Sequence, residues 1–454
     1  MNKNKNMELE STPIKKLFWK YFIPSFTSVA VNSLYNIVDR IFIGHGVGAY
    51  ALSGLSAVFP IMIIMMAFGM LVGMGAGVRI SINMGKGDMS RAAKVLGNAL
   101  TLLILLALGV TVLGFAVKGP VLKLFGASNQ TIGYANDYLN IILFGTIFNM
   151  VGFGMNNLIR SEGNAKIAMY SIIISAGTNL ILDPIFIFCF DMGVKGAAIA
   201  TIISMAILCI WVLYHFVKSP KANIHVKRED MKLQGDIVWY IFTIGFAPFS
   251  MQIAASLVQG ILNTQLIKYG GDLAVGAMGI INSVINLIIM SMIAINMASQ
   301  PIIGYNIGAK KYKNVKEVLF LGIRFATVVG VICWIIVELY PQGIVKLFNH
   351  DSPELMKLST RGLRVLLITL PVVGFQVVVS NYFQSIGKAL TATIMSLLRQ
   401  VILLIPLLLV IPQHYGLEGV WICGPISDTM SFIFVLFLFF FEMKKLNKNI
   451  EQNI

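Results

Sequence analysis

Long apolar runs, each about the length of a membrane-spanning helix, follow one another along most of the chain. Stretches such as Val58–Gly77, Leu100–Val117 and Ile394–Ile411 are nearly free of charged residues. A bilayer requires about 20 apolar residues per spanning helix, whereas barrel strands alternate in polarity over about 10 residues, a pattern that this sequence lacks. The runs predict twelve helices, at about residues 23–44, 51–76, 93–117, 131–157, 167–188, 194–217, 236–267, 274–300, 316–338, 356–383, 389–411 and 417–442.

The composition agrees with a membrane protein and excludes several other classes. Of the 454 residues, 57% are hydrophobic and 12% are charged, and the mean hydropathy is +0.80. The net charge of +15 does not indicate a nucleic-acid partner, because the basic residues are spread over membrane-flanking loops rather than gathered in one patch. The four cysteines lie far apart without metal-ligand spacing, so no metal site is expected.

Lysine and arginine residues concentrate in every second loop, for example in Lys218–Lys232, in Lys310–Lys316 and in the tail Lys444–Lys448. Such a bias marks the cytoplasmic side of a membrane protein. We therefore predict a cytoplasmic N-terminal segment (1–22), a cytoplasmic linker (218–235) and a cytoplasmic tail (443–454). The first helix is expected to stay in the membrane, because its apolar run lacks a small-residue cleavage site.

The two halves of the chain align with each other at an offset of about 223 residues. Three matches of loop and helix sequence occur in the same order: "NMGKGDMSRAAKVL" with "NIGAKKYKNVKEVL", "RSEGNA" with "QSIGKA", and "GVKGAAIATIIS" with "GLEGVWICGPIS". Each copy holds six helices, so both copies enter the membrane in the same direction. The repeat predicts an all-α polytopic protein with two six-helix lobes, 23–217 and 236–442, related by a pseudo-two-fold axis along the membrane normal.

Polar side chains inside the predicted spans are costly, so their positions indicate function. The first helix carries four such residues on one face, and the seventh helix repeats this face without an acid. These residues are Ser28, Asn32, Tyr35 and Asp39 in the first helix, and Gln252, Ser256, Gln259 and Asn263 in the seventh.

The fifth helix adds Asn179 and Asp183, one turn apart, and the sixth adds Thr201. Counting residues from the helix ends places Asp39, Asp183 and Thr201 at similar depth in the first lobe. Two carboxyl groups that meet in a low dielectric cannot both ionise cheaply, so such a site would hold a proton or a monovalent cation. The alternative is that Asp39 pairs with Arg40 and that Asp183 caps a helix break at Pro184.

The second lobe has a charged pair of its own, because Arg399 and Asp428 both fall near the middle of the membrane in the eleventh and twelfth helices. A buried ion pair is expected between them. This pair either has a purely structural role or shapes a cavity.

The "NSLYNIVDRIFIG" segment from Asn32, the "RSEGNAK" loop from Arg160 and the "NLILDPIFIF" segment from Asn179, together with the repeat, resemble the multidrug and toxic compound extrusion (MATE) family. The likeness is to the prokaryotic branch that includes the DNA-damage-inducible protein F. It implies a cation-coupled drug antiporter with a V-shaped cleft, located in the bacterial inner membrane. The coupling residues that it implies are Asp39, Asp183, Tyr35, Asn179, Thr201 and Asn157.

Three functions follow as hypotheses. The first is export of amphipathic organic cations or drugs in exchange for H⁺ or Na⁺ by a monomer without a cofactor, with a substrate cleft lined by Asn32, Gln252, Gln259 and Asn263. The second is a lipid-linked saccharide flippase, which would require more arginines or lysines at membrane depth than Arg40 and Arg399. The third, a membrane enzyme, is not expected, because the five histidines lie far apart and no HExxH or GxSxG motif occurs.

Overall fold

The computed structural model describes residues 9–10, 12–348 and 352–452. The described residues divide into two compact units, of which one contains Lys20–Phe249 and the other contains Ser250–Ile454 together with Pro13–Trp19. The predicted cytoplasmic segments 1–22 and 443–454 include residues 1–8, 11 and 453–454, which lie outside the described residues. We keep as predictions the lobe limits, 23–217 and 236–442, and the linker, 218–235.

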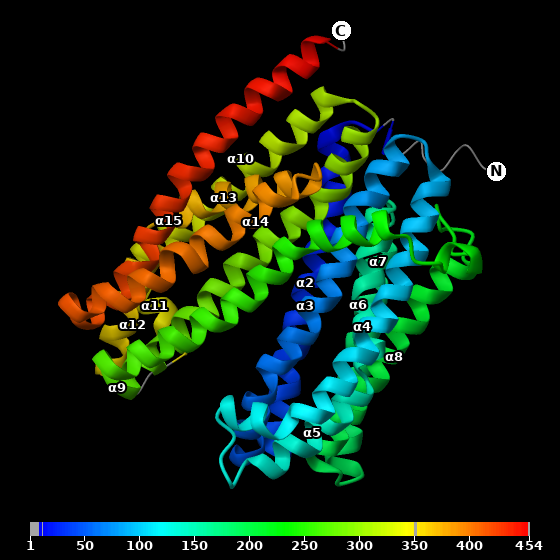
Figure 1. Ribbon diagram of the computed structural model, residues 1–454. Coiled ribbons are helices and arrows are strands. Elements are labelled where there is room, and N and C mark those ends of the chain that lie inside the picture. Colours follow the sequence, from blue (N-terminus) through cyan, green and yellow to red (C-terminus); the bar gives the residue numbers. More distant parts are fainter. Residues whose placement is uncertain (1–8, 11, 349–351, 453–454) are drawn as a thin grey trace. The chain divides into compact units, whose positions relative to one another are not determined.

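The first unit is built from long helices and one bent pair of shorter ones (Figure 1). Its elements are α2 (Ile14–Gly46), α3 (Ala49–Gly85), α4 (Met89–Leu124), α5 (Ile132–Phe144), α6 (Thr146–Ser161), α7 (Ala165–Pro184), the π-helical turn η1 (Ile185–Cys189), α8 (Gly193–Lys218) and the 3₁₀ turn η2 (Arg228–Met231).

The second unit follows the same order of elements (Figure 1). They are α9 (Gly235–Gly308), which begins in the first unit, α10 (Tyr312–Leu339), the short α11 (Pro341–Lys346), α12 (Pro353–Leu367), α13 (Leu370–Ser385), α14 (Ala389–Leu397), the π-helix η3 (Leu398–Leu404) and α15 (Ile405–Gln452).

Some breaks in the helices fall inside predicted spans, and others separate one span from the next. Within the described residues, seven helices are long and apolar enough to cross a membrane, or nine if each bent pair, α5–α6 at 57° and α12–α13 at 49°, counts as one span. Two of these helices contain a glycine with positive φ, Gly271 in α9 (64°) and Gly416 in α15 (57°), a conformation that other residues rarely adopt. Each glycine separates two spans, so with α2 the described residues form twelve helical segments where the sequence predicts them.

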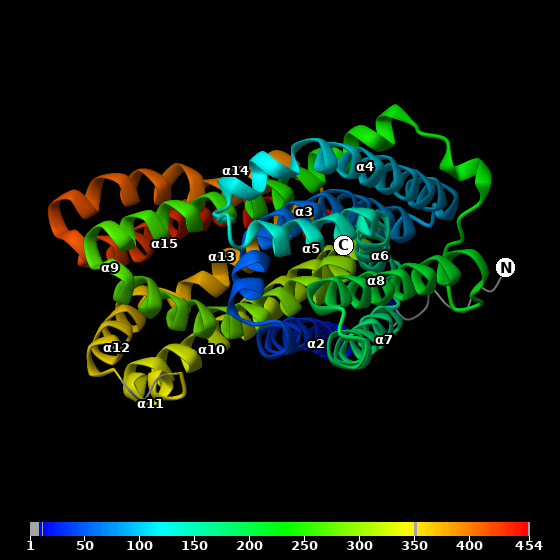
Figure 2. The same cartoon turned by 90° about the horizontal axis from the view of Figure 1, so that it is seen from below.

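Small residues allow close contact between helices in the first unit. A Cβ atom added to Gly73 of α3 would lie 2.8 Å from the carbonyl oxygen of Gly154 in α6, and one added to Gly154 would meet Leu103 of α4 at 2.7 Å. Figure 2 shows α3, α5 and α6 lying together in this unit. Inside a membrane the hydrophobic effect does not drive helices together, so they associate through close packing of this kind.

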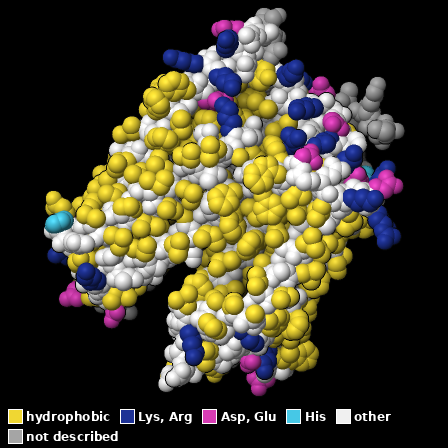
Figure 3. Space-filling model, in the orientation of Figure 1, with side chains coloured by type: hydrophobic (Ala, Val, Ile, Leu, Met, Phe, Trp, Pro, Cys, Tyr) yellow, Lys and Arg dark blue, Asp and Glu magenta, His cyan; other side chains and the backbone are white. Residues whose placement is uncertain are grey.

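Charged and apolar side chains occupy different zones of the surface. Hydrophobic side chains cover the long sides of the helices, and Lys, Arg, Asp and Glu gather near helix ends (Figure 3). Large apolar residues such as Phe144 and Trp239 are 72% and 74% exposed. A water-soluble protein rarely exposes apolar surface on this scale, so the sides of the helices are suited to lipid.

The amide side chain of Asn98 helps to hold the predicted linker against the first unit. Asn98 of α4 is fully buried, donates through Nδ2 to the carbonyl oxygens of Asp230 (3.1 Å) and Lys232 (3.0 Å), and accepts from the backbone N–H of Gln234 (2.7 Å). Gly97 permits this approach, because a Cβ there would lie 2.4 Å from Asp230 O. The linker is therefore an ordered part of the first unit.

We expect Gly245→Ala to destabilise the first unit. A Cβ atom at Gly245 would lie 1.7 Å from the carbonyl oxygen of Leu71 in α3, and overpacking costs about 1–3 kcal/mol. The matched control is Gly260→Ala on the same helix, where nothing lies within 4 Å. Thermal unfolding followed by size-exclusion chromatography should show a loss for Gly245→Ala alone, and equal midpoints for both variants would contradict the tight contact.

Candidate functional site

A buried carboxyl group stands at the end of α7. Asp183 is 1% exposed, and its Oδ1 accepts a hydrogen bond of 3.2 Å from Asn179 Nδ2, one turn earlier. Its Oδ2 is buried and has no hydrogen-bond partner among the residues that the structure describes. Helix α7 does not stop at Pro184 but continues as the π-helical turn η1, a feature that is frequent at functional sites. The acid therefore sits where the helical hydrogen-bonding pattern changes.

The second acid approaches from α2. Asp39 lies close enough to Asp183 for the two carboxyl groups to interact electrostatically, and Tyr35, one turn before Asp39, lies near both. The Tyr35 hydroxyl also interacts with the side chain of Asn36. The structure thus brings Asp39, Asp183, Tyr35 and Asn179 into one cluster within the first unit. The side chain of Arg40, the alternative partner of Asp39, lies outside the described residues.

Helices α5 and α8 close the cluster with two hydroxyl groups. Tyr138 of α5 is 3% exposed, interacts electrostatically with Asp39 and Asp183, and lies near the predicted residue Thr201 of α8. Thr201 also donates to the carbonyl oxygen of Ala197 at 2.9 Å. Sequence reasoning missed Tyr138, because an aromatic residue in a span is usually packing. The repeat did contain an indication, because the residue of the second copy that aligns with Tyr138 is Gly362. The tyrosine is therefore particular to the first copy.

Two other predicted residues have partners outside this cluster. Asn157 of α6 donates to the carbonyl oxygen of Phe153 (3.1 Å) and accepts from Arg160 Nη1 (3.1 Å), so its amide is part of an arginine network at the end of α6. Asn32 is exposed, and its backbone oxygen accepts from Asn36 Nδ2 at 2.6 Å. A coupling role for Asn157 and a cleft role for Asn32 stay predictions.

The polar face of α9 contains no acid. Gln259 donates through Nε2 to Oδ1 of Asn263 at 3.0 Å, and Gln252 is half-buried two turns earlier. The repeat aligns Asn263 with Asp39 and Gln259 with Tyr35. This face of the second unit can therefore donate and accept hydrogen bonds but carries no negative charge.

An ion pair in the second unit joins the buried Asp428 to the partly exposed Arg399. Arg399 Nε donates to Asp428 Oδ1 at 2.5 Å, and Thr369 donates to Oδ2 at 3.0 Å. Ser427 donates to the backbone oxygen of Arg399, where the π-helix η3 interrupts the regular helix. In the first copy the aligned residues Ser175 and Ser204 join the equivalent helices through one neutral hydrogen bond of 2.8 Å. The second copy thus adds two charges to a contact that the first makes without charge.

A further buried acid, which sequence reasoning missed, joins α6, α8 and the linker. Glu162 is fully buried and accepts from His215 Nε2 (2.5 Å), from Asn164 Nδ2 (2.6 Å) and from the backbone N–H of Asn223 (3.0 Å). The N–H of Ile224 adds a longer bond of 3.3 Å. Glu162 and Asn164 belong to the "RSEGNA" motif, but His215, Asn223 and Ile224 lie more than 50 residues away, which no local pattern indicates. Its carboxyl group fixes the loop after α6 to the start of the linker.

These features define a class of protein: a polytopic helical membrane protein of two repeated lobes, with paired carboxyl groups inside one lobe only. A model of the MatE family matches residues 24–185 and matches again at residues 248–410. The chain therefore belongs to the MatE family, the multidrug and toxic compound extrusion family, as its motifs indicate. The two matches begin 224 residues apart and confirm the internal repeat.

Relatives and solved structures agree with the family and confirm the two-lobe, twelve-helix fold. The chain is 28% identical over 414 residues to the multidrug export protein MepA of Staphylococcus aureus strain MSSA476, covering 90% of each. It is 38% identical, with a TM-score of 0.88, to the MATE multidrug transporter DinF-BH solved in complex with rhodamine 6G, covering 95% of this chain and 96% of that one. A MATE family transporter in an outward-facing conformation has a TM-score of 0.92 at 23% identity, covering 98% and 99%.

We expect Glu162→Ala to be among the most destabilising single changes in the first unit. It removes a buried acceptor and leaves several buried donors without a partner, each at about 1–3 kcal/mol. Differential scanning fluorimetry of the detergent-purified protein measures the loss. Glu229→Ala, at an exposed acid of the linker, is the matched control. A midpoint for Glu162→Ala that equals the control would show that the buried carboxyl group does not hold the loop.

We expect Arg399→Ser to fold less well than Arg399→Ser combined with Asp428→Met. The single change leaves the Asp428 carboxylate buried without its cation, at a cost of about 3–5 kcal/mol. The double change installs the residues that the first copy carries, Ser175 and Met205. Yield and melting temperature in detergent compare the two. A double variant no better than the single one would contradict the stabilising role of the pair.

Proposed function

We propose that the protein exports amphipathic, cationic organic compounds in exchange for H⁺ or Na⁺, and that Asp39 and Asp183 bind the coupling ion. The observation that supports this most directly is the buried Asp183 carboxyl group, with one oxygen bonded to Asn179 and the other without a hydrogen-bond partner among the described residues. A buried carboxylate oxygen without a donor favours a proton or a cation. The multidrug export names of the relatives and the complex of DinF-BH with rhodamine 6G support the substrate class.

In the proposed exchange, the coupling ion and the organic cation compete for the negative charge of the two carboxyl groups. Two adjacent carboxyl groups bind one positive charge well, whether it is a proton, a sodium ion or an organic cation, and bind a second one weakly. The hydroxyl groups of Tyr35, Tyr138 and Thr201 supply neutral oxygens that suit either ion. In one-for-one exchange with protons, each unit of pH difference corresponds to about 1.4 kcal/mol, enough for a tenfold gradient of compound.

Binding of the ion drives transport only if it favours one conformation over another. We propose alternating access, in which one form holds the coupling ion and the other holds the exported compound. The substrate residues Asn32, Gln252, Gln259 and Asn263 are part of this proposal. We also propose that the protein is a monomer in the bacterial plasma membrane. The distribution of lysine and arginine among the loops supports a cytoplasmic location for both termini.

The two alternative functions receive less support. A flippase for lipid-linked saccharides would use cationic side chains inside the membrane to hold pyrophosphate. Arg399, however, already donates through Nε to Asp428. An enzyme would need a nucleophile with a base beside it. His215, the most deeply buried histidine among the described residues, instead contacts Glu162 in a structural network.

Transport in proteoliposomes tests the coupling site. We expect Asp39→Asn and Asp183→Asn each to lower gradient-driven export of rhodamine 6G at least tenfold. The reason is that an amide cannot take up the coupling cation. A pH gradient and a sodium gradient are applied separately to identify the ion.

The matched control is Asp137→Asn, at an exposed acid of the same unit that pairs with Lys195 at 3.4 Å. We expect export by this variant to equal that of the unmodified protein. Unchanged export by both Asp39→Asn and Asp183→Asn under both gradients would rule out the proposed site.

A further inference from the structure

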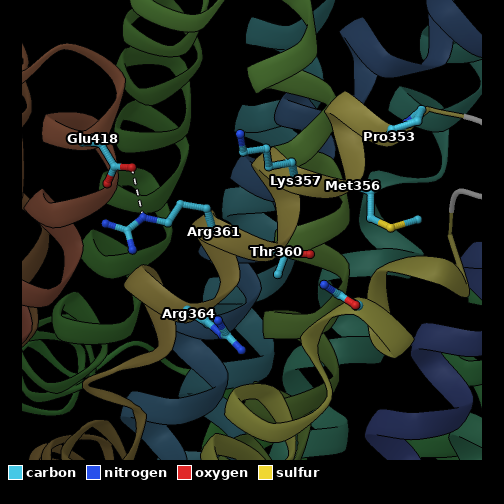
Figure 4. Close-up of a pocket in the computed structure, with 8 residues that line it drawn as sticks. Pro353, Met356, Lys357, Thr360, Arg361, Arg364 and Glu418 are labelled. Atoms are coloured by element: carbon cyan, nitrogen blue, oxygen red, sulfur yellow. Dashed lines mark hydrogen bonds and ion pairs between the residues drawn. The ribbon is translucent and has the colours of Figure 1, made fainter.

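A pocket in the second unit shares no lining residue with the acid cluster or with the Arg399–Asp428 pair. Its volume is about 730 Å³, and side chains of α11, α12 and α15 line it (Figure 4). Most of the lining comes from α12, the half of the α12–α13 pair that precedes the bend. This half is amphipathic, whereas the sequence predicted an ordinary span over 356–383.

Cationic side chains dominate the lining. Lys357, Arg361 and Arg364 are spaced by four and three residues, so they share one face of α12 over about 10 Å. Among the described residues of the lining, the only acid is Glu418, at the N-terminal end of the last span. These side chains therefore have a net positive charge even after Glu418 is counted.

The ion pairs of this pocket leave N–H groups of its cationic side chains available to a ligand. Arg361 Nε lies 3.0 Å from Glu418 Oε1, as Figure 4 shows, yet the arginine side chain remains 60% exposed. Arg364 pairs with Glu338 at 3.6 Å and remains 49% exposed. Lys357 is exposed and, within the described part of the chain, has no ion-pair partner.

A hydroxyl group adds a fourth donor. Thr360 lines the pocket, one turn before Arg364, and its Oγ1 is buried without a hydrogen-bond partner among the described residues. A buried hydroxyl without a partner costs free energy that a ligand oxygen would recover. Two guanidinium groups, an ammonium group and a hydroxyl are together the donor set that binds phosphate.

The repeat shows that the fold does not require this basic face. The aligned positions of α5 are Gly133, Asn136, Asp137 and Asn140 in place of Lys357, Thr360, Arg361 and Arg364. The ion pair itself recurs with opposite polarity, because Asp137 and Lys195 take the places of Arg361 and Glu418. The first copy makes the same helix contact without a row of cations, so the row serves another purpose.

We propose that this pocket binds the phosphate-bearing headgroup of an anionic membrane lipid. Apolar surface beside the pocket favours a lipid over free phosphate. Met356 and Pro353 belong to the lining, and the neighbouring Tyr340 and Leu347 are 69% and 81% exposed. An acyl chain would cover these side chains while its headgroup accepts hydrogen bonds from Lys357 and Arg364. The proposal does not depend on the exported compound or the coupling ion.

Native mass spectrometry of the delipidated, detergent-purified full chain tests the proposal, with titrations of dioleoylphosphatidylglycerol, dioleoylphosphatidylcholine and inorganic phosphate. We expect phosphatidylglycerol to bind more tightly than phosphatidylcholine. We expect Lys357→Gln and Arg364→Gln each to weaken its binding about fivefold, the value for losing one cation near a membrane surface. Inorganic phosphate at millimolar concentration should not displace the lipid.

The matched control is Lys123→Gln, at an exposed lysine of α4 in the first unit. This variant should bind phosphatidylglycerol as the unmodified protein does. Equal binding of the two lipids, or equal weakening by Lys123→Gln, would overturn the proposal. Displacement by inorganic phosphate would also overturn it, because the pocket would then be a site for the free anion.

Discussion

The absence of water inside a bilayer is the constraint on which the rest of this structure depends. A polar group that loses water must find its partner within the protein, which restricts spanning segments to helices and confines charges to pairs. Asp428 therefore contacts both Arg399 and Thr369, and Glu162 collects donors from three segments. An exception is Asp183 Oδ2, which has no hydrogen-bond partner among the described residues. An unsatisfied buried oxygen costs free energy, and the proposed bound proton or cation would offset that cost.

Repetition preserves the contact positions but not the charges. At one helix end the first copy pairs Asp137 with Lys195, and the second copy pairs Arg361 with Glu418. The attraction is the same when both signs are exchanged, so exchange of the two charges leaves the packing of the repeat unaffected. Each lobe thus acquires a different electrostatic character on the same helical scaffold. Function is found in the differences between the copies.

The sequence predicted the helices well because membrane spans depend on local composition. It also located the cluster acids, since Tyr35 and Asp39, like Asn179 and Asp183, lie one turn apart on a single helix. It did not reveal Tyr138, Glu162 or the basic face of α12. Tyr138 contacts residues of three other segments, and Glu162 meets His215 across 53 residues. Such contacts depend on tertiary packing, which neither periodicity nor motif spacing reports.

The contrast between the two lobes explains why the proposed ion site has only one copy. In the second lobe the buried carboxylate of Asp428 already has a cation of the protein's own, Arg399, at 2.5 Å. An external ion would have to displace a tethered guanidinium group, which competes at a very high effective concentration. In the first lobe the aligned position of Arg399 is Ser175, which bears no charge and donates to a backbone oxygen. The second lobe also carries Asn263 where the first carries Asp39, so the proposed exchange of a proton or sodium ion for an organic cation belongs to the lobe that has the paired acids.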